Sequence, residues 1–328
     1  MSSPLSTDTG IRRLLVAAGQ APSVLNTQPW RFRVVRGEYA EVLADHDRRL
    51  RVMDPRGRSL HVSCGAALFN LRLALRVAGC RPLVRLLPDP ADPTVLAAVR
   101  SAAQATPSAR VRALCAEIPQ RRTNREPYTG KRVPPPVLAE LREAAAREGA
   151  TLLVLGRNSS AELLEYVAIA DEELATDHDY LAEVNAWTID GSHVDGLPRA
   201  VLGPKPLNDP APIRDFGITR PGQPRPSAEF ERRPQLAVLT TPGDGPVDWL
   251  RAGQALQRVL LTASLFGVSV SFLNQPLDLR DMRGRTDPHH RRGHVQMIMR
   301  LGYGPPVPRA PRRPPAELLR EPDELVAV

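Results

Sequence analysis

The chain has 328 residues, of which 42% are hydrophobic and 24% charged, a composition typical of a globular protein of about two domains. No apolar run reaches the roughly 18–20 residues of a membrane span, and the first ten residues lack the basic and apolar regions of a signal peptide. The net charge of +8 favours anionic partners, but the arginines that carry it are dispersed and aromatic residues are only 4%, so we expect neither a nucleic-acid nor a membrane partner.

Apolar periodicity and turn residues predict the elements of the first 118 residues. They begin with a helix over 9–20, a hairpin of 31–36 and 39–45 that turns at a glycine, and a long helix over 60–78. A strand over 81–87, a helix that starts in the turn cluster 88–93 and a helix over 109–118 follow. The three cysteines (Cys64, Cys80 and Cys115) are odd in number and have no C-x-x-C spacing. We therefore expect reduced thiols and a cytoplasmic protein.

The composition changes after residue 118, where the basic, proline-broken segment 119–136 forms a linker or a binding loop. The predicted helices and strands that follow are 137–147, 151–155, 159–176, 235–241, 247–266, 268–273 and 295–301. Between them, 191–234 is dense in proline and glycine, which indicates a functional flap or a disordered segment. The proline-rich tail is expected to be extended. The predicted fold class is α+β, and the chain is expected to contain two copies of an arrangement in which long helices pack on a small mixed sheet.

Two distant stretches of the chain resemble each other. Residues 64–80 (CGAALFNLRLALRVAGC) and 252–268 (AGQALQRVLLTASLFGV) are both apolar helices that end at a glycine and lead into a strand. Gly65 matches Gly253 in this alignment, so counterparts are 188 positions apart. The repeat predicts a chain built from two related halves, with a ligand at the seam between them.

The segment APSVLNTQPWRF, between the first helix and the first strand, is a candidate binding loop. Pro22 fixes its backbone, and Ser23, Asn26 and Gln28 are polar side chains suited to hydrogen-bond a planar heterocycle. The same residues also fit an ordinary Asx-type turn leading into a strand. Local chemistry leaves both interpretations open.

Arginines cluster at mid-chain in the run RRTNR, which comprises Arg121, Arg122, Thr123 and Arg125 around one asparagine. Guanidinium groups donate paired, charge-assisted hydrogen bonds to phosphate oxygens, so the run suits a phosphate dianion. A solvated basic linker is the alternative.

Two further groups of residues are weaker candidates. The tail arginines Arg309, Arg312 and Arg313 could join a phosphate site or form an ordinary charged terminus. At the exit of the strand after the second repeat helix, backbone amides could face a ligand edge, or the strand could simply end. The residues at this exit are Leu273, Asn274 and Gln275.

Several classes of site lack support. The run DPHHRRGH contains Asp287, His289, His290 and His294, but it lacks the ligand spacing of a metal site on a helix, so we expect no metal. The chain contains no G-x-S-x-G, no Walker loop and no G-x-G-x-x-G after a strand. Classical hydrolase, kinase and Rossmann interpretations therefore lose support.

Taken together, these motifs resemble the nitroreductase superfamily of FMN proteins. APSVLNTQPWRF resembles its flavin loop, RRTNR its phosphate motif, WLRAGQALQRVLLTASLFGVSVSF its core helix and strand, and MIMRLGYGPP with PRR its last strand and tail. Here the flavin loop lies near the N-terminus and the phosphate motif opens the second half. This order resembles the Acg-type subfamily, in which one chain imitates the nitroreductase dimer.

The resemblance implies two fused nitroreductase-like halves, 1–118 and 119–328, with a lid over about 187–234 and one FMN at the seam. It places the cofactor against Pro22, Ser23, Asn26, Gln28, Arg121, Arg122, Thr123, Arg125, Leu273, Asn274, Gln275, Arg312 and Arg313. The mirror site is expected to be dead, because residues 11–14 stand in place of its phosphate motif and Leu86 in place of Asn274. Leu25 occupies a position where the subfamily often has histidine.

By this resemblance the protein is an oxidoreductase that passes hydride from NADH or NADPH through flavin N5 to a small electron acceptor. No catalytic side chain is required, because solvent can supply protons. The alternative is a flavin storage protein whose lid plugs the cofactor face with Trp187, Pro198, Phe216 and Phe230. Either protein could be a monomer or a homodimer.

Overall fold

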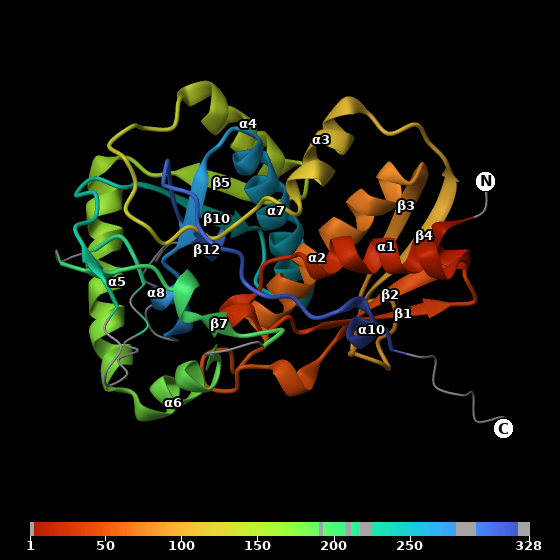
Figure 1. The fold of residues 1–328 in the computed structure, drawn as a ribbon, viewed down its shortest axis with the longest axis horizontal. Coiled ribbons are helices and arrows are strands. Elements are labelled where there is room, and N and C mark those ends of the chain that lie inside the picture. Colours follow the sequence, from red (N-terminus) through yellow and green to blue (C-terminus); the bar gives the residue numbers. More distant parts are fainter. Residues whose placement is uncertain are drawn as a thin grey trace.

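Two long helices, α2 (Arg58–Val77) and α7 (Pro246–Leu265), cross at the centre of the molecule (Figure 1). The computed structural model describes residues 3–189, 193–207, 211–214, 216, 225–279 and 293–320. The Asp54 carboxylate accepts from the Leu60 N–H at the start of α2, while α7 begins with Pro246 and has Asp248 in its first turn. These are the two repeat helices predicted from the sequence.

The first half packs one antiparallel sheet against α1 and α2. The strand order is β1-β2-β4-β3, and the core contains the fully buried Trp30, Phe32, Leu68 and Leu96. The elements of this half beside α2 are α1 (Asp8–Gly19), β1 (Trp30–Val35), β2 (Tyr39–Ala44), β3 (Cys80–Leu86), β4 (Val95–Gln104) and α3 (Ala109–Glu117).

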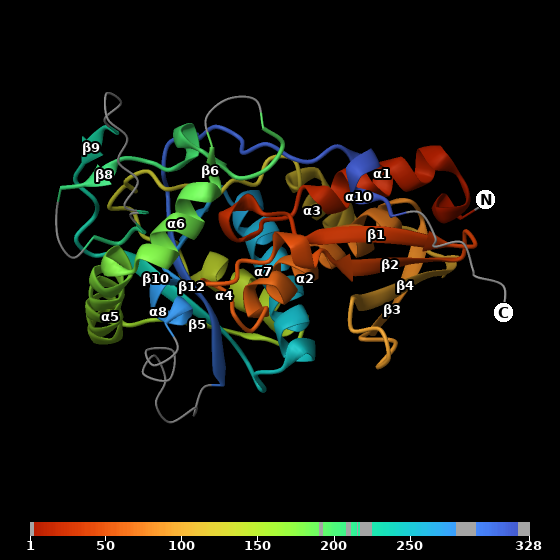
Figure 2. The same ribbon diagram turned by 90° about the horizontal axis from the view of Figure 1, so that it is seen from below.

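The second half repeats this arrangement with an insertion. Its strand order, written from the first strand, is β5-β10-β12-β11, and the sheet is again antiparallel. Along the chain, each half runs helix, strand, strand, long helix, strand, strand. The strands β5, β10, β11 and β12 therefore take the places of β1, β2, β3 and β4. Figure 2 shows the two sheets on either side of the α2–α7 pair. The elements of this half beside α7 are α4 (Pro135–Ala146), β5 (Thr151–Val154), β10 (Gln235–Thr241), β11 (Ser269–Phe272) and β12 (His294–Gly302).

The insertion lies between β5 and β10, where the first half has only the turn between β1 and β2. It consists of α5 (Arg157–Thr176), α6 (His178–Ala186), β6 (Thr188–Ile189), β7 (Leu197–Pro198), the 3-10 turn Arg199–Val201, β8 (Lys205–Pro206) and β9 (Ser227–Ala228). The remaining short elements are the 3-10 turns Pro4–Ser6, Val24–Asn26 and His46–Arg48, and the helices α8 (Gln275–Asp278) and α10 (Pro315–Leu318).

Both four-stranded sheets are antiparallel, and parallel pairing occurs in isolated bridges at their edges and in the two-stranded pairs β6–β7 and β8–β9. Leu319 bridges Phe32 of β1, and the Arg320 N–H donates to the Phe32 carbonyl at 2.7 Å. Thr123 bridges Val270 of β11 in the same way. The C-terminal tail thus leaves the second half and packs against the first.

One predicted element is wrong. The turn cluster 88–93 was expected to start a helix, but the chain forms β4, whose alanine-rich sequence has good intrinsic helix propensity. β4 lies between β2 and β3 and completes the ladders of both, so tertiary pairing overrides the local preference. Helix α6 is also absent from the prediction.

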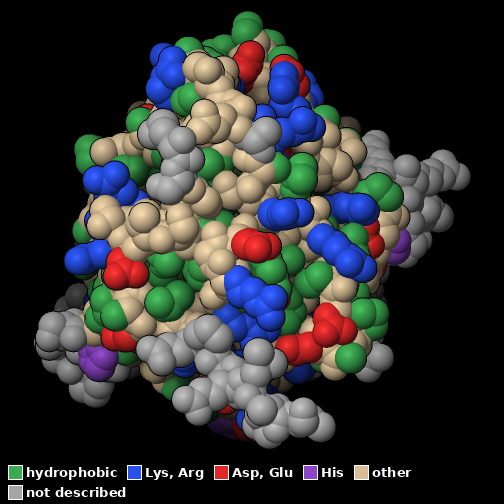
Figure 3. Space-filling model, turned by 90° about the vertical axis from the view of Figure 1, so that its right-hand side faces the viewer, with side chains coloured by type: hydrophobic (Ala, Val, Ile, Leu, Met, Phe, Trp, Pro, Cys, Tyr) green, Lys and Arg blue, Asp and Glu red, His purple; other side chains and the backbone are tan. Residues whose placement is uncertain are grey.

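Three global features concern membrane-spanning helices, the cysteines and the distribution of surface charge. Within the described ranges, no helix has both the length and the apolar character needed to cross a membrane. The three cysteines are free. On the face shown in Figure 3, basic side chains are scattered among acidic and apolar ones instead of forming one stripe.

Candidate functional site

Two adjacent cavities open between the halves and share Pro22, Ser23, Thr123 and Arg125 in their walls. The first, which we call the apolar cavity, has a volume of about 90 Å³. Its walls come from the 21–28 loop, the first turns of α2, the middle of α7, and strands β11 and β12. The second, the arginine cavity, has a volume of about 50 Å³ and lies between the same loop, the mid-chain run and the tail.

The loop that walls both cavities has an unusual backbone. Leu25, Asn26 and Gln28 have positive φ values of 45°, 55° and 50°. A left-handed conformation is uncommon for residues other than glycine, and a bulky leucine is a genuine outlier. Such strain concentrates at ligand sites, where the surrounding contacts maintain it. Here Leu25 is buried in a cluster that includes Leu197 and Phe216 from the insertion.

Asn26 joins three distant segments at the arginine cavity. Its Nδ2 donates to the carbonyls of Gly196, at 2.9 Å, and Pro311, at 3.1 Å. Its Oδ1 accepts from Arg312 at 3.0 Å. The side chain therefore positions the insertion and the tail around the cavity and is itself fully engaged.

Five arginines line the arginine cavity: Arg121, Arg122, Arg125, Arg309 and Arg312. Four of these five were predicted phosphate ligands, and Thr123 lies among them. Within the described ranges, none of the five has a carboxylate within ion-pair distance. The positive charges of Arg121, Arg122, Arg309 and Arg312 therefore lie close to one another. The Arg125 guanidinium donates to the Val201 carbonyl and lies over the Phe216 ring.

Arg121 is a buried member of this group with unfilled hydrogen-bond donors. It is 6% exposed, and its Nε and Nη1 atoms have no hydrogen-bond partner among the described residues. Burial, and then the charge of Arg122, lower the pKa of Arg121 to about 10. Burial and three arginine neighbours likewise lower the pKa of Arg312 to about 9. Unfilled donors and unbalanced charge fit a bound dianion, and a phosphate group meets both requirements.

Asn274 reaches the apolar cavity from the exit of β11. Its Oδ1 accepts from the Ile298 N–H at 2.9 Å, which fixes the amide plane. Among the described residues, the acceptor of its Nδ2 is the Met297 sulfur, at 3.6 Å, which is a weak acceptor. An amide donor is therefore available to a polar ligand edge at this wall. Pro22 and Ser23 form part of the opposite side of the seam.

Gln28 and Arg313 lie outside both cavity walls. Gln28 is fully buried; its Oε1 accepts from the Arg313 N–H at 2.9 Å and its Nε2 donates to the Val194 carbonyl at 2.8 Å. The Arg313 guanidinium lies 3.6 Å from the Asp45 carboxylate. These side chains fasten the tail and the insertion to the first half instead of facing the cavities.

Leu273 and Gln275 also lie outside both walls. Leu273 is fully buried in the core, and its N–H donates to the Ile298 carbonyl at 3.0 Å. Gln275 begins α8, and its Nε2 donates to the Asp171 carboxylate at 3.1 Å. Of the strand-exit triplet, only Asn274 reaches the apolar cavity.

Sequence reasoning missed several lining residues, including Ser63 and Asp278. Asp278 forms an ion pair with Arg214 at 2.8 Å, and Arg214 also donates to the Tyr180 hydroxyl. Burial raises the pKa of Asp278. No helix is predicted from the sequence at this position; in the structure, α8 places Asp278 in the cavity wall one turn after Asn274.

The mirror position of the apolar cavity lies in the hydrophobic core of the first half. Val62 and Leu256 line the apolar cavity, and their repeat counterparts are Leu250 and Leu68. Both counterparts are fully buried in the hydrophobic core of the first half. Residues 11–14 lie within α1.

The candidate metal run gives no support for a metal site. Asp287, His289 and His290 lie outside the described residues, and only His294 falls within them. Across the part of the chain that is described, no group of three or more His, Cys, Asp or Glu side chains could hold a metal ion.

The chain is similar to curated mycobacterial proteins over nearly its whole length. It is 34% identical over 322 residues to "Putative NAD(P)H nitroreductase Rv3131" of Mycobacterium tuberculosis H37Rv, covering 96% of this chain and 92% of the relative. It is 29% identical over 325 residues to the protein acg of the same strain, described with the same activity, covering 96% of each chain. No family model matches the chain.

Solved structures show a weaker likeness. A nitroreductase with bound FMN from Bacteroides fragilis matches 60% of this chain and 92% of its own, with a TM-score of 0.36 and 16% identity. The FMN-dependent nitroreductase NfnB from Mycobacterium smegmatis, in complex with NADPH, matches 61% and 95%, with a TM-score of 0.37 and 14% identity. Family membership rests on the sequence relatives: the chain belongs to the nitroreductase family, in the branch that includes the mycobacterial Acg protein.

Proposed function

We propose that this protein is an FMN-dependent oxidoreductase that holds one flavin at the seam between its halves. The observation that carries the proposal is the arginine cavity, whose buried Arg121 has unfilled donors and no carboxylate partner in the described chain. It adjoins a cavity whose walls are mainly apolar, with the Asn274 amide on one side. A phosphate next to an apolar, planar group matches this pair of cavities.

Each side chain has a defined task in this proposal. Arg121, Arg122, Arg125 and Arg312 donate to the phosphate oxygens, with the Thr123 hydroxyl at the junction of the two cavities. The Asn274 amide, held by the Ile298 N–H, donates to the polar edge of the ring. The roles of Gln28, Leu273, Gln275 and Arg313 are then indirect, through the positions of the loop, the strand exit and the tail.

The bound cofactor supplies hydride transfer, from NADH or NADPH to a small acceptor, and the protein supplies binding, orientation and electrostatics. Positively charged arginines at one end of the site favour the reduced, anionic form of the cofactor. No side chain is required as an acid, because the protons can come from solvent. We assign the halves to 1–118 and 119–328, supported by their identical strand connectivity, and propose that they arose by internal duplication.

Flavin storage without turnover is the second candidate, and one observation favours it. Phe216 lines the apolar cavity and lies between the guanidiniums of Arg125, 5.4 Å away, and Arg214, 5.2 Å away. The remaining volume of about 90 Å³ is below the roughly 300 Å³ at which ligand pockets begin. A ring must therefore displace Phe216 to enter, and a Phe216 that returns over the bound ring would exclude nicotinamide.

Anaerobic mixing of the FMN-loaded protein with NADPH separates the two functions. Loss of the oxidised-flavin absorbance within seconds supports the oxidoreductase, and persistent yellow colour supports storage. A purified protein that is colourless and takes up no FMN contradicts both.

A further inference from the structure

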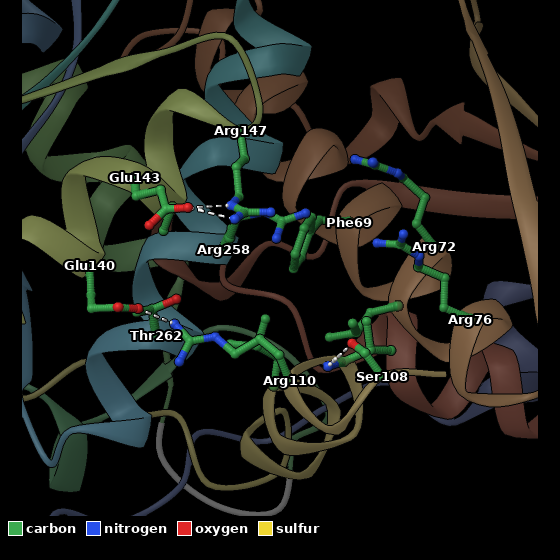
Figure 4. A pocket seen from close by; sticks show the side chains of 14 residues that line it. Phe69, Arg72, Arg76, Ser108, Arg110, Glu140, Glu143, Arg147, Arg258 and Thr262 are labelled. Carbon is green, nitrogen blue, oxygen red and sulfur yellow. Dashed lines mark hydrogen bonds and ion pairs between the residues drawn. The ribbon is translucent and has the colours of Figure 1, made fainter. Parts of the chain in front are cut away.

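A third cavity, of about 420 Å³, lies between helices α2 and α3 of the first half and α4 and α7 of the second (Figure 4). We call it the four-helix cavity. None of its lining residues lines the apolar or the arginine cavity. It is also several times larger than either of them, so it is a separate candidate site.

The four-helix cavity carries an excess of positive charge. Two glutamates, Glu140 and Glu143, line it, and Glu148 lies behind its wall, where it pairs with two of the arginines. Five guanidiniums therefore face three carboxylates, which leaves two positive charges unbalanced. The five arginines are Arg72, Arg76, Arg110, Arg147 and Arg258.

The arginines fall into a rim and a floor. The rim pairs Arg110–Glu140 and Arg147–Glu143 are between 43% and 63% exposed, so they exchange readily with another anion. On the floor, Arg72 and Arg258 share Glu148 at 2.6 Å each. Both guanidiniums also lie over the Phe69 ring, at 5.7 and 4.9 Å, which holds them in place.

Unfilled hydrogen-bonding groups add a second observation. Thr262 lines the cavity and is fully buried, yet its Oγ1 has no partner among the described residues. The Nε of Arg72 is likewise buried and has no hydrogen-bond partner among the described residues. Arg76 has no carboxylate partner in the described chain. A ligand with several acceptor oxygens would satisfy all three groups.

The pseudo-symmetry of the halves relates this cavity to the proposed phosphate site. Arg147 is the C-cap of α4, and its counterpart in the first half is Gln20, the C-cap of α1, which lines the arginine cavity. Arg72 and Arg76 correspond to Leu260 and Ser264 of α7, which share a surface depression with Arg121 and Arg122. The four-helix cavity thus occupies the mirror region of the phosphate cluster, with a different set of arginines.

We propose that the four-helix cavity binds a phosphate monoester of a small organic molecule, independently of the flavin. The dianion matches the two unbalanced charges, and paired guanidiniums suit phosphate oxygens. The cavity is larger than phosphate alone requires, and Leu73, Val111 and Leu114 provide apolar wall for an organic group. The residues that mirror Val62 and Leu256 of the apolar cavity belong to the hydrophobic core, whereas the region that mirrors the phosphate cluster keeps a cavity lined with arginines.

Isothermal titration calorimetry on the FMN-loaded full-length protein tests this proposal. The probes are adenosine 5′-monophosphate, inorganic phosphate and adenosine, each titrated into wild type, Arg76→Ala, Arg142→Ala and Arg122→Ala. Arg76 and Arg142 are both exposed helical arginines, but only Arg76 lines the cavity. We expect one-to-one binding of the monophosphate, weakened about tenfold or more by Arg76→Ala and unchanged by Arg142→Ala.

The titration results can be interpreted whether or not the proposal of a flavin site is correct. Inorganic phosphate binding with the same dependence on Arg76 supports the anion site and removes the organic part of the ligand. The proposal is overturned if neither phosphate probe binds saturably, if adenosine binds as well as its monophosphate, or if Arg122→Ala abolishes binding while Arg76→Ala does not. A protein that takes up no FMN can still be titrated, and the Arg76 result is interpreted in the same way.

Discussion

Gly65 of α2 and Gly253 of α7 pack backbone against backbone where the two central helices cross. A Cβ on Gly65 would lie 3.1 Å from the Gly253 Cα and would overlap the Leu250 carbonyl oxygen. A Cβ on Gly253 would lie 2.8 Å from the Gly65 Cα and would overlap the Val62 carbonyl oxygen. Val62 and Leu250 are themselves repeat counterparts, so the contact is self-complementary, like an interface across a twofold axis.

Alanine at either glycine should therefore destabilise the protein. The added methyl group meets rigid backbone, so the helices must separate, and overpacking of this kind costs about 1–3 kcal/mol or more. Denaturant unfolding of Gly65→Ala and Gly253→Ala should show similar losses of unfolding free energy. Gly130→Ala is the control, because nothing lies within 4 Å of its Cβ position. Equal stability of all three variants would contradict the close crossing.

The repeat explains why much of the fold was predictable from sequence. Gly65 and Gly253 fall at matching positions of two apolar helices, and each helix leads into a strand, so the likeness of the two stretches indicated two related halves. Strand β4 was not predictable in this way, because its alanine-rich residues become a strand only through pairing with β2 and β3. Local propensity carries no information about that pairing.

The candidate site likewise contains residues that a local motif predicts and residues whose positions depend on long-range contacts. Residues in compact local motifs, such as Arg121 and Arg122, lie together in the wall of the arginine cavity. Gln28 and Arg313 do not line it, because they bond to each other across 285 positions of the chain, and no local pattern reports such a contact. Phe216 lines the apolar cavity from the insertion, and it shares a buried cluster with Leu25 and with Tyr180 and Val184 of α6.

Replacing Arg121 by methionine should have opposite effects on flavin retention and on apoprotein stability. Flavin affinity should fall about tenfold or more, because one charge-assisted contact of about 1.5–3 kcal/mol is lost. The apoprotein should become more stable, because the variant removes a buried charge with unfilled donors. Fluorescence titration with FMN and thermal denaturation without it measure the two quantities.

Arg12→Ala is the matched control for that experiment. Arg12 lies in α1, outside the walls of both the apolar and the arginine cavity, and should affect neither quantity. Equal flavin loss in the Arg12 and Arg121 variants would contradict a single working phosphate site. A less stable Arg121→Met apoprotein would contradict the unbalanced charge.

Removing the Phe216 side chain should speed flavin entry. The ring forms part of the apolar cavity wall and contacts the Arg125 and Arg214 guanidiniums, so Phe216→Ala opens space and removes two cation–π contacts but no hydrogen bond or ion pair. Stopped-flow quenching of FMN fluorescence should show a faster association rate, and reduction by NADPH should become faster if Phe216 covers the ring. Phe230→Ala controls for general loosening of the insertion, because Phe230 packs on Arg300 instead. Identical rates in both variants would remove Phe216 from the entry path.

Substitutions at Asn274 should separate a structural role from a role in the chemistry. Asn274→Leu installs the residue found at the mirror position and leaves the buried Ile298 N–H without its acceptor, which should cost about 1–3 kcal/mol of unfolding free energy. Asn274→Asp keeps that acceptor but replaces the Nδ2 donor with a negatively charged oxygen. Its stability should stay near wild type, while anaerobic reduction by NADPH should slow, because charge that develops on the reduced cofactor is then repelled instead of stabilised. A reduction rate in Asn274→Asp equal to that of wild type would show that Asn274 only holds β12.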